Sequence, residues 1–305
     1  MKAHIHILSP SGAINPALID GATLRLEEMG YQVSVAPHAK GVCGRFAGTE
    51  EERLDDLNAA LADPAVDIIL CARGGYGLQQ IVERIKLKVE RLKVKGGAKG
   101  PIVVGFSDIT ELHQWCGLHG LHSLHGLMCK HIAELPADSE PVQLWHQALR
   151  GETLEYTLPT HPLNRAGEVA GRLIGGNLSV LYGLQATPYS LHALMDMHPN
   201  EKFILFIEDI GERHYHIDRM MQNLRMSGVM ARIGGLIVGQ FSDVEEDGLM
   251  GCSVYETVCR AAAEYDYPIV VDFPAGHVER NLPLWMNSEC VMRVNNKESK
   301  VISKL

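Results

Sequence analysis

Residues 102–110 read IVVGFSDIT, and this stretch decides the fold class of the chain. Residues 102–104 form an apolar run that predicts a buried strand, Gly105 predicts a turn, and the pattern from Ile109 onward predicts a helix. A strand, a tight turn and a helix are the repeating unit of α/β folds. Ser107 lies on the turn itself, where it either caps the helix or is a nucleophile raised out of the sheet.

The rest of the first half repeats this alternation. We expect strands over residues 3–8, 31–36, 67–72 and 102–104 and helices over residues 16–29, 49–62, 78–85 and 109–116. Apolar strands that alternate with helices predict a parallel sheet covered on both faces, of the Rossmann or flavodoxin-like type. Ligands bind beyond the carboxyl ends of the strands in such sheets, and both Ser107 and the RGGYG loop at residues 73–77 are expected there.

The second half begins differently and then resumes the alternation. Residues 150–171 hold Gly151, Pro159, Pro162 and Gly167 among polar residues and predict an irregular linker. After it we expect a Gly-Gly turn entering a helix within residues 174–184, strands over 202–207, 235–239 and 268–271, and helices over 216–227 and 254–264. The expected fold class is therefore α/β, with an N-terminal domain at residues 1–149, a linker at 150–171, a C-terminal α/β domain at 172–305, and the site between the two domains.

The composition is that of a globular chain with neither a nucleic-acid nor a membrane partner. Hydrophobic residues make up 46% and charged residues 21% of the 305 positions, and the net charge of −9 argues against nucleic-acid binding. We interpret the main basic cluster, Lys86 to Lys99, as a solvated helix end and loop. No apolar stretch is long enough to span a bilayer, and the N-terminus lacks a signal segment, so we expect neither a membrane span nor export.

Seven cysteines are scattered along the chain without a C-x-x-C pair, which predicts free thiols and a cytoplasmic location. Residues 113–131 (HQWCGLHGLHSLHGLMCKH) concentrate histidines and cysteines, so a metal site is an alternative. Their spacing matches neither H-E-x-x-H nor a zinc finger, and Gly117, Gly120 and Gly126 interrupt any helix that would align them. We therefore expect neither a metal nor another cofactor.

The Ser107 turn has the arrangement of a nucleophile elbow, in which a strand, a sharp turn and a helix expose a serine hydroxyl. The N–H of Asp108, at the start of the helix, is then a candidate donor to an oxyanion. The pattern G-x-S-x-G is incomplete, because Ile109 stands where the second glycine belongs. The alternative is that Ser107 or Asp108 caps the helix, and both interpretations hold together if Asp108 caps with its side chain while its N–H faces the oxyanion.

The RGGYG loop at residues 73–77 follows a predicted buried strand. Adjacent glycines allow the backbone to turn its N–H groups outward, so Gly74 and Gly75 are candidate donors to an oxyanion or a carboxylate. The loop is neither a P-loop, which needs G-K-[ST], nor a dinucleotide-binding G-x-G-x-x-G. A plain strand-to-helix turn is the alternative.

Glu208 and His277 are candidates for the acid and base that would activate Ser107. Glu208 ends the apolar run at residues 203–207, where a charge is costly unless it is paired or solvated. His277 lies in a loop after a predicted strand, a position suited to a general base. The chain order Ser, Glu, His is that of α/β-hydrolases, although here the nucleophile and its partners fall in different predicted domains. The alternatives are an exposed strand end for Glu208 and a structural role for His277, one of 15 histidines.

The motifs together resemble one family, the LD-carboxypeptidases, that is, the muramoyl-tetrapeptide carboxypeptidase group of serine peptidases, which also includes the microcin-immunity peptidases. In chain order the motifs are SPSG at residues 9–12, RFAGTEEERLDDLN at 45–58, ARGGYG at 72–77, GFSDIT at 105–110, HGLM at 125–128, GGNL at 175–178, IEDIGE at 207–212 with DRM at 218–220, and GHVERNLPL at 276–284. Two departures are Leu127, where the family usually has proline, and Trp285, where a small residue is common. Neither falls on a position of the triad.

This resemblance implies a catalytic triad of Ser107, Glu208 and His277 in a cleft between the domains. The oxyanion donors would be the N–H of Asp108 and one from the Gly74-Gly75 loop. The implied reaction is cleavage of the L,D amide between a diamino acid and the terminal D-alanine of a murein tetrapeptide or muropeptide, as in peptidoglycan recycling. The resemblance also implies a homodimer.

Residues that would bind this substrate are expected on the same basis. A carboxypeptidase needs a cation or an N–H cluster for the terminal carboxylate, and Arg45, Arg73 and Arg213 are candidates. Tyr76 and Asn177 are further candidates for substrate binding. The alternatives are a related serine peptidase or amidase of peptide conjugates and a protein that binds a muropeptide without cleaving it. Because all three triad residues are present, binding without cleavage is the weaker alternative.

Overall fold

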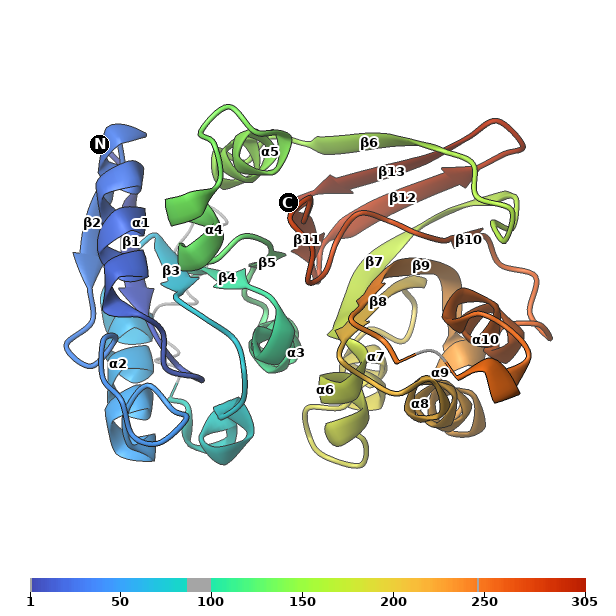
Figure 1. The fold of residues 1–305 in the computed structure, drawn as a ribbon, viewed down its shortest axis with the longest axis horizontal. Helices are drawn as coiled ribbons and strands as arrows, with labels where there is room; N and C mark the ends of the chain where they lie inside the picture. The colour runs from blue at the N-terminus through green and yellow to red at the C-terminus, as the bar shows by residue number, and fades with distance from the viewer. Residues whose placement is uncertain (1, 87–99, 246) are drawn as a thin grey trace.

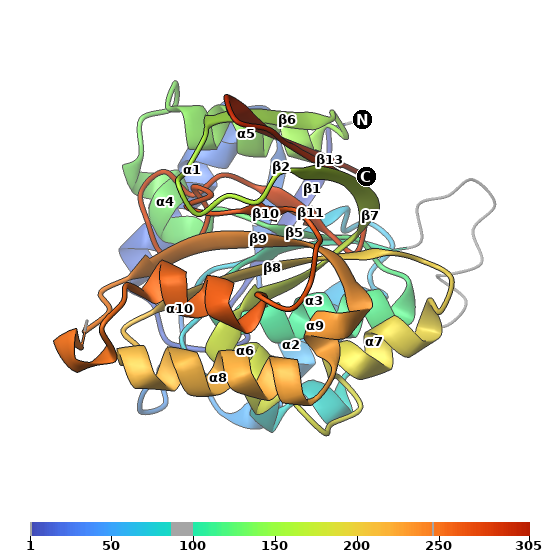
Figure 2. The same cartoon turned by 90° about the vertical axis from the view of Figure 1, so that its right-hand side faces the viewer.

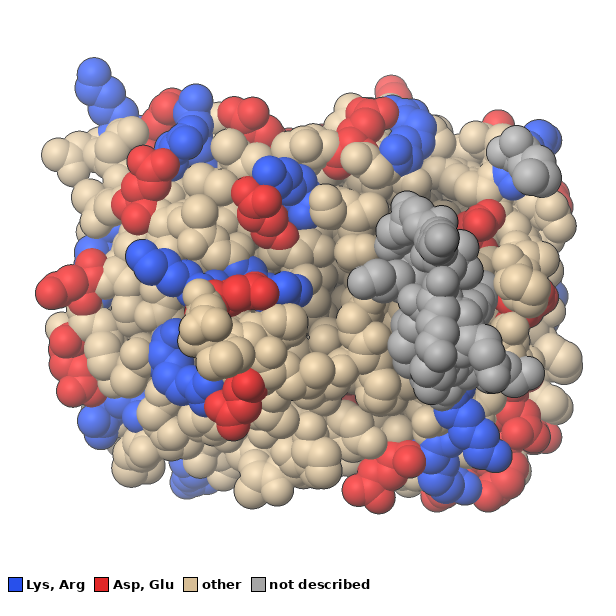
Figure 3. Space-filling model, turned by 180° about the vertical axis from the view of Figure 1, so that it is seen from behind, with Lys and Arg blue, Asp and Glu red and all other residues tan. Residues whose placement is uncertain are grey.

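The computed structural model describes residues 2–86, 100–245 and 247–305, and within them two sheets are surrounded by helices (Figure 1). Apart from Lys86, the basic cluster interpreted as a helix end and loop lies outside the described residues. No helix of the described part of the chain is both long and apolar enough to cross a membrane. On the face seen in Figure 3, basic and acidic side chains are intermixed rather than gathered into a basic patch.

The first sheet has the strand order β11-β5-β4-β3-β1-β2. Its strands are β1 (His4–Leu8), β2 (Gln32–Val35), β3 (Ile68–Cys71), β4 (Ile102–Gly105), β5 (Ser123–His125) and β11 (Leu284–Met286). β1 to β5 are parallel, which confirms the predicted N-terminal parallel sheet, whereas β11 pairs antiparallel with β5. Because β11 comes from near the C-terminus, the first sheet is not built from one continuous stretch of chain.

The first half of the chain also supplies five α-helices in the described residues. They are α1 (Pro16–Glu28), α2 (Glu50–Ala62), α3 (Thr110–His119), α4 (Cys129–Glu134) and α5 (Glu140–Leu149). The helix predicted over residues 78–85 is instead two 3-10 turns, η1 (Leu78–Gln80) and η2 (Val82–Arg84). The guanidinium of Arg53 binds both the carbonyl of Gly77 and Oε1 of Gln80, and these bonds hold the segment in its tighter turn.

The second sheet has the strand order β10-β9-β8-β7-β12-β13-β6. Its strands are β6 (Leu154–Pro159), β7 (Gly167–Asn177), β8 (Phe203–Ile210), β9 (Ile233–Ser242), β10 (Ile269–Val270), β12 (Glu289–Val294) and β13 (Glu298–Lys304). β7 to β10 are parallel, and β12, β13 and β6 extend the sheet antiparallel from β7. Figure 2 shows, on one side of the parallel part, the helices α6 (Leu178–Gly183), α7 (Leu191–Met197), α8 (His214–Met226), α9 (Val229–Arg232) and α10 (Val254–Ala261).

The prediction of an irregular linker over residues 150–171 is wrong. β6 occupies residues 154–159, and β7 begins at Gly167. β6 is the outermost strand of the second sheet, and its side chains alternate between buried and exposed from Leu154 onward. Proline has no backbone N–H to donate, and the end of an edge strand tolerates Pro159 because no further strand requires a donor there. Pro159 and the exposed residues of β6 therefore belong to a sheet edge, whereas Gly151 and Pro162 lie in the turns before and after this strand.

The prediction of a Gly-Gly turn before the next helix is also wrong. Gly175 and Gly176 continue β7 with φ values of +120° and +133°, and the helix begins only at Leu178. A Cβ at Gly175 would collide with the carbonyl oxygen of Phe206 on β8, and a Cβ at Gly176 would collide with the side chain of Thr110 on α3. Gly176 therefore allows α3 to pack closely against the second sheet, and Gly175 allows β7 to lie close to the backbone of β8.

One apolar core joins the two sheets. It extends from the first sheet across one face of the second, where it includes Leu154, Phe206 and Met292. A second apolar cluster lies between the parallel part of the second sheet and its helices. α3 contacts both β5 and β7, so it belongs to both halves. Because the halves share buried apolar surface, packing rather than a flexible connection sets their relative position.

Trp285→Ala should lower the free energy of unfolding by about 3–5 kcal/mol, because it removes a large side chain from β11 where that strand enters the shared core. Trp285 has no exposed surface, whereas Leu305 is 48% exposed and serves as the control. Leu305→Ala should change the free energy of unfolding by no more than about 0.5 kcal/mol. Chemical denaturation followed by circular dichroism measures both, and equal stabilities would contradict this role of β11.

Candidate active site

Ser107 lies on the sharp turn between β4 and the 3-10 turn η4 (Ser107–Ile109), which leads into α3. Its φ is +67°, a left-handed conformation that costs a residue with a Cβ about 1–2 kcal/mol. A Cβ at Gly105 would lie 2.8 Å from Cγ1 of Ile109, so the turn depends on a glycine at position 105. The conformation is that of a nucleophile elbow, and Ile109 is accommodated in place of the second glycine because its side chain packs over Gly105.

Asp108 holds the elbow to two neighbouring loops. Its Oδ2 accepts hydrogen bonds from Ser11 Oγ at 2.6 Å and from Leu78 N at 3.1 Å. Burial raises the pKa of the Asp108 carboxyl, although these two bonds and the charge of Arg53 oppose the rise. The alternative in which Ser107 or Asp108 caps the helix is wrong, because neither η4 nor α3 has a side-chain hydrogen bond at its N-cap. Asp108 instead fixes the elbow against the SPSG segment and against η1, the 3-10 turn that follows the RGGYG loop.

The RGGYG loop passes directly beside the serine. Gly12 N donates to Gly74 O at 3.0 Å, which anchors the loop to the SPSG segment. A Cβ on Gly74 would lie 2.8 Å from Cβ of Ser107 and 3.1 Å from its Oγ, so this approach requires glycine. Gly75 has a φ of +105°, in the region that favours glycine. The loop backbone thus lies where the predicted oxyanion donors would be needed, and their role stays a prediction.

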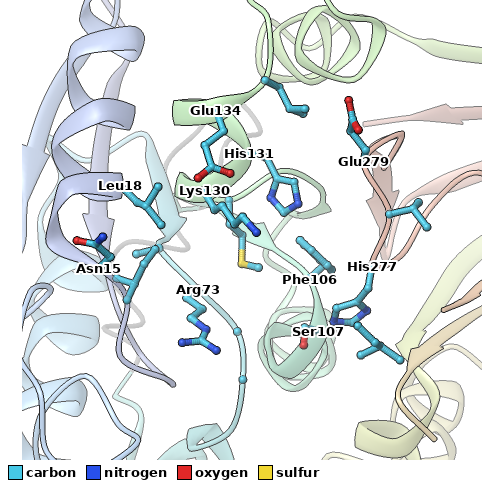
Figure 4. A pocket seen from close by; sticks show the side chains of 18 residues that line it. Asn15, Leu18, Arg73, Phe106, Ser107, Lys130, His131, Glu134, His277 and Glu279 are labelled. Atoms are coloured by element: carbon cyan, nitrogen blue, oxygen red, sulfur yellow. The ribbon is translucent and has the colours of Figure 1, made fainter. Parts of the chain in front are cut away.

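His277 and Glu208 approach Ser107 from the other half of the chain. His277 Nδ1 lies 2.8 Å from Oε2 of Glu208, a residue of β8 with no exposed surface. With Nδ1 engaged, Nε2 is the ring nitrogen left to exchange a proton. Figure 4 shows the imidazole and the Ser107 side chain next to each other in one pocket. The structure therefore brings the three predicted triad residues together.

Gly276 and Asn281 shape the loop that carries His277. Gly276 has a φ of +134°, and a Cβ there would lie 3.0 Å from Oε2 of Glu208. Gly276 N donates to Oδ1 of Asn281, a fully buried residue, at 2.9 Å. Asn281 is not among the predicted site residues, although it lies within the GHVERNLPL motif. Its side chain holds the turn that precedes His277 and so orients the imidazole.

The surroundings of His277 raise the pKa of its imidazole. Burial alone would lower this pKa, but the hydrogen bond to Glu208 and the negative charges of Glu208, Asp209 and Asp243 together outweigh burial. Neutral imidazole, the form that accepts a proton, therefore predominates only above the ordinary histidine pKa of about 6.5. The carboxylate of Glu208 thus favours the positively charged form of the imidazole.

A chain of hydrogen bonds connects the elbow to the strand that carries Glu208. Thr110 Oγ1, on the first residue of α3, accepts from Asn177 N at 2.8 Å. Asn177 Nδ2 donates to Asp209 Oδ1 at 3.0 Å, and Asn177 Oδ1 caps α6 by accepting from Val180 N. Thr110, Asn177 and Asp209 are all buried. These hydrogen bonds fix the position of the half that carries the elbow relative to the half that carries Glu208 and His277.

Asp209 is a second buried carboxylate directly after Glu208 on β8. It accepts hydrogen bonds from Ser179 N at 2.8 Å and from Ile210 N at 2.9 Å, besides the bond from Asn177. Burial, followed by the charge of Glu208, raises the pKa of Asp209 to about 7. The charge of Asp209 therefore changes near neutral pH, close to an imidazole whose pKa it helps to raise.

The elbow, the glycine loop and the loop of His277 border a cavity of about 890 Å³ between the two halves (Figure 4). The predicted site residues that line it are Arg73, Gly74, Gly75, Ser107 and His277. Its position confirms that the site lies between the halves of an α/β chain.

Four predicted substrate-binding residues are not part of the cavity wall. The guanidinium carbon of Arg45 lies 5.8 Å from the centroid of the Tyr76 ring, and neither residue lines the cavity. Arg213 lies at the N-cap of α8 with a side chain that is 62% exposed. Asn177 is engaged in the buried chain of hydrogen bonds described above. Arg73 is thus the best placed of the candidates, and a role for the others in binding stays a prediction.

The sequence did not indicate that α4 contributes to the cavity. Lys130, His131 and Glu134 line it, together with Asn15 from the N-cap of α1 and Glu279 from the loop after the imidazole. Burial, together with nearby positive groups, lowers the pKa of His131 to about 4, so its ring is neutral near pH 7. α4 begins at the end of the His/Cys-rich segment. The hydrophobic pattern of this segment has no helical or strand period, so the sequence does not indicate which of its residues line a cavity and which lie in the core.

Histidines of the His/Cys-rich segment pack behind the elbow. His113 Nε2 lies 3.1 Å from the carbonyl oxygen of Gly105. The rings of His125 and His131 lie against Phe106, with centroids 5.6 Å and 5.5 Å away. Within the described ranges, no group of three or more His, Cys, Asp or Glu residues is arranged to hold a metal ion. These histidines therefore support the turn that carries Ser107.

Family models match most of the chain. Residues 5–126 match the LD-carboxypeptidase N-terminal domain, and residues 170–292 match the LD-carboxypeptidase C-terminal domain. The chain belongs to the LD-carboxypeptidase family. The resemblance seen in the motifs is therefore confirmed, and the two family domains correspond to the two halves that border the cavity.

Named relatives and solved structures agree with this membership. The chain is 31% identical to the probable murein peptide carboxypeptidase of Bacillus subtilis, over 97% of this chain and 91% of that protein. It is 27% identical to the murein tetrapeptide carboxypeptidase of Pseudomonas aeruginosa, over 92% and 90% of the two chains. The muramoyltetrapeptide carboxypeptidase from Oxalobacter formigenes shares the fold with a TM-score of 0.85, at 24% identity over 99% of both chains. The microcin C7 self-immunity protein MccF also shares it with a TM-score of 0.82, at 18% identity over 99% of this chain and 96% of that one.

Thr110→Val should lower the free energy of unfolding by about 1–3 kcal/mol, because it leaves the buried N–H of Asn177 without its acceptor. Thr110→Ser keeps the hydroxyl and should retain most of the stability. Urea denaturation of the parent and the two variants measures the difference. A valine variant as stable as the serine variant would show that this bond does not hold the halves in register.

Glu208→Gln should lower the pKa of His277, because the amide keeps the shape of the side chain but removes its negative charge. In the parent, the pKa should lie above the ordinary value. NMR titration of the imidazole measures both, with the resonance assigned from its loss in His277→Gln. The matched control is Glu212→Gln, which removes a carboxylate 3.1 Å from Nδ1 of His216 and should leave His277 unchanged. An unshifted His277 pKa in Glu208→Gln would refute the electrostatic role of Glu208.

Proposed function

We propose that this protein is a serine LD-carboxypeptidase that removes the terminal D-alanine from murein tetrapeptides by cleaving the amide that joins it to a diamino acid. The observation that carries the proposal is the position of Ser107, on an elbow beside a hydrogen-bonded His277–Glu208 pair in the cavity of an LD-carboxypeptidase family chain. Relatives named as murein peptide and murein tetrapeptide carboxypeptidases support the choice of substrate.

In the first half of the reaction, Nε2 of His277 takes the proton of the Ser107 hydroxyl while Oγ attacks the carbonyl carbon of the amide. The new Oγ–C bond leaves an oxyanion, for which the N–H groups of Asp108 and of Gly74 or Gly75 are the proposed donors. His277 then gives its proton to the amide nitrogen, the C–N bond breaks, and D-alanine leaves with a free amino group.

In the second half, water replaces D-alanine. It gives one proton to His277 and its oxygen attacks the acyl carbon. The Oγ–C bond then breaks, Ser107 recovers its proton from His277, and the tripeptide leaves with a new carboxyl group. The carboxylate of Glu208 stabilises the imidazolium, an interaction that water screens little because Glu208 is fully buried.

Arg73 is the proposed anchor for the terminal carboxylate of the substrate. It lines the cavity next to Gly74 and Gly75, the loop that lies against Ser107. Its Nη1 donates to the carbonyl of Ala13 at 2.5 Å, which orients the guanidinium and leaves its other N–H groups for the substrate. A guanidinium matches a carboxylate with two parallel hydrogen bonds.

The proposal also includes a cytoplasmic location, a role in peptidoglycan recycling within cell-wall metabolism, and a homodimer. All seven cysteines are free, which fits a reducing compartment. The recycling role follows from a murein tetrapeptide as substrate. The homodimer rests on the family resemblance alone.

Ser107→Ala should reduce the release of D-alanine from a purified murein tetrapeptide by at least about 10³-fold, because it removes the nucleophile and leaves the cavity otherwise intact. Mass spectrometry of the products measures the release. Ser139→Ala, a matched change at a hydroxyl outside the cavity lining, should keep the parent rate.

Parent-like turnover in Ser107→Ala would refute the assignment of the nucleophile. A parent enzyme that leaves the tetrapeptide intact but cleaves a peptide–nucleotide conjugate would favour the second candidate function, a conjugate peptidase. The fold shared with MccF is the reason to include that substrate.

A further inference from the structure

The imidazole of His125 packs against two of the segments that carry the triad. His125 is the last residue of β5 and has no exposed surface. Its ring centroid lies 5.6 Å from that of Phe106, the residue directly before Ser107. On the other side it lies 4.9 Å from that of Phe206, two residues before Glu208 on β8. His125 is not among the described residues that line the cavity, so any effect it has on the reaction passes through its neighbours.

The third contact of His125 is with the loop that carries His277. Nε2 of His125 lies 3.3 Å from Oδ1 of Asn281. The same Oδ1 accepts a hydrogen bond from the N–H of Gly276, the residue directly before His277, at 2.9 Å. The amide atom that accepts a backbone N–H is the oxygen, which has no hydrogen to give, so Nε2 of His125 is the donor of the second bond. His125 is therefore the Nε2–H tautomer, and its ring donates into the loop of His277.

The ring of His125 is uncharged near pH 7. Burial and the neighbouring imidazoles of His113 and His277 lower its pKa well below the ordinary value, although the bond to Asn281 opposes this fall. Its other nitrogen, Nδ1, is buried and has no hydrogen-bond partner among the described residues, which costs free energy. An apolar ring would fill the same space without this cost. What the imidazole adds to the core is thus its N–H to Asn281.

Asn281 is the buried side-chain anchor of the loop it belongs to. The base of the loop is closed by a backbone bond from Leu282 N to Pro274 O at 2.8 Å. Arg280 also pairs with Glu140 of α5, but these side chains are 52% and 48% exposed, and an exposed ion pair contributes little. The orientation of the turn inside the loop therefore depends on the bonds of Asn281. A displacement of about 1 Å at a reacting group costs as much as about 10²-fold in rate.

We propose that His125 is a positioning residue for His277. The Nε2–H of His125 fixes the side chain of Asn281, and Asn281 fixes the turn at Gly276. The imidazole of His277 is thereby held on Glu208 while its own Nε2 faces the nucleophile. The inference rests on the proposed function, because this alignment serves catalysis only if His277 exchanges a proton with the nucleophile.

The test compares two substitutions at one position. His125→Phe keeps a ring in the core but removes the N–H, whereas His125→Gln carries an amide N–H that reaches the place of Nε2. We measure kcat and KM for D-alanine release from a murein tetrapeptide, and the pKa of His277 by NMR titration. His125→Phe should lower kcat by about tenfold or more and change KM by less than about twofold, because the cavity wall is unaltered. The pKa of His277 should also fall, because its hydrogen bond to Glu208 raises this pKa against burial. His125→Gln should recover most of kcat and of the pKa.

His214→Phe is the matched control. His214 is also fully buried, its Nε2 lies 2.8 Å from Oγ1 of Thr257 on α10, and its Nδ1 likewise has no partner among the described residues. Its side chain is directed to α10 and does not line the cavity. This variant loses a buried imidazole bond of the same kind, and it should keep the parent kcat and the parent pKa of His277.

The route of the effect is checked with Asn281→Ala. The double variant His125→Phe/Asn281→Ala should be no slower than Asn281→Ala alone, because both changes remove the same connection. Losses of kcat that combine additively would overturn the proposal.

The remaining outcomes separate this proposal from the proposed function. His125→Phe with the parent kcat and the parent His277 pKa overturns the positioning role, and so does a glutamine variant no better than the phenylalanine variant. If the parent releases no D-alanine, the proposed function fails, and the pKa of His277 in the two variants still decides the role of His125. Nitrogen-15 NMR of the parent should show His125 as the Nε2–H tautomer. The Nδ1–H tautomer would overturn the proposal even where a variant does not fold.

Discussion

The active site depends on two adjacent carboxylates, Glu208 and Asp209, buried near the end of β8. Successive side chains of a strand point to opposite faces, so the two carboxylates serve different parts of the site. Glu208 holds the imidazole of His277, and Asp209 holds Asn177, whose N–H in turn binds Thr110 at the start of α3. One strand end therefore positions both the imidazole of His277 and the helix that follows Ser107.

Burying two neighbouring carboxylates costs free energy, and hydrogen bonds to each carboxylate offset that cost. The same hydrogen bonds hold His277 and Asn177 in position. Burial and the charge of Glu208 raise the pKa of Asp209 to about 7. The charges of Glu208 and Asp209 in turn raise the pKa of His277 against the effect of burial. The shared apolar core and the contacts of α3 with both sheets keep these groups in place. The same buried groups thus affect both the stability of the fold and the charge of the His277 imidazole.

Elements with a strong local pattern were predictable, and those defined by distant partners were not. The parallel strands of the first sheet followed from apolar runs that alternate with helices. The strand β6 was missed because Pro159 and its polar neighbours resemble a linker until β13 is placed beside it. The pair Gly175 and Gly176 resembles a turn until α3 and β8 are packed against it. In each case the deciding contact lies far away in the chain.

The same distinction holds for the site. The sequence by itself determined the α/β class, the elbow at Ser107 and, through the order of its motifs, the three triad candidates, because periodicity and motif order are local or linear properties. Only the tertiary structure decided that Asn177 connects α3 to β8 through hydrogen bonds instead of lining the cavity. It also decided that Lys130 and Glu134 line the cavity. Which side chains share a cavity depends on contacts between residues far apart in the chain, and no local pattern contains them.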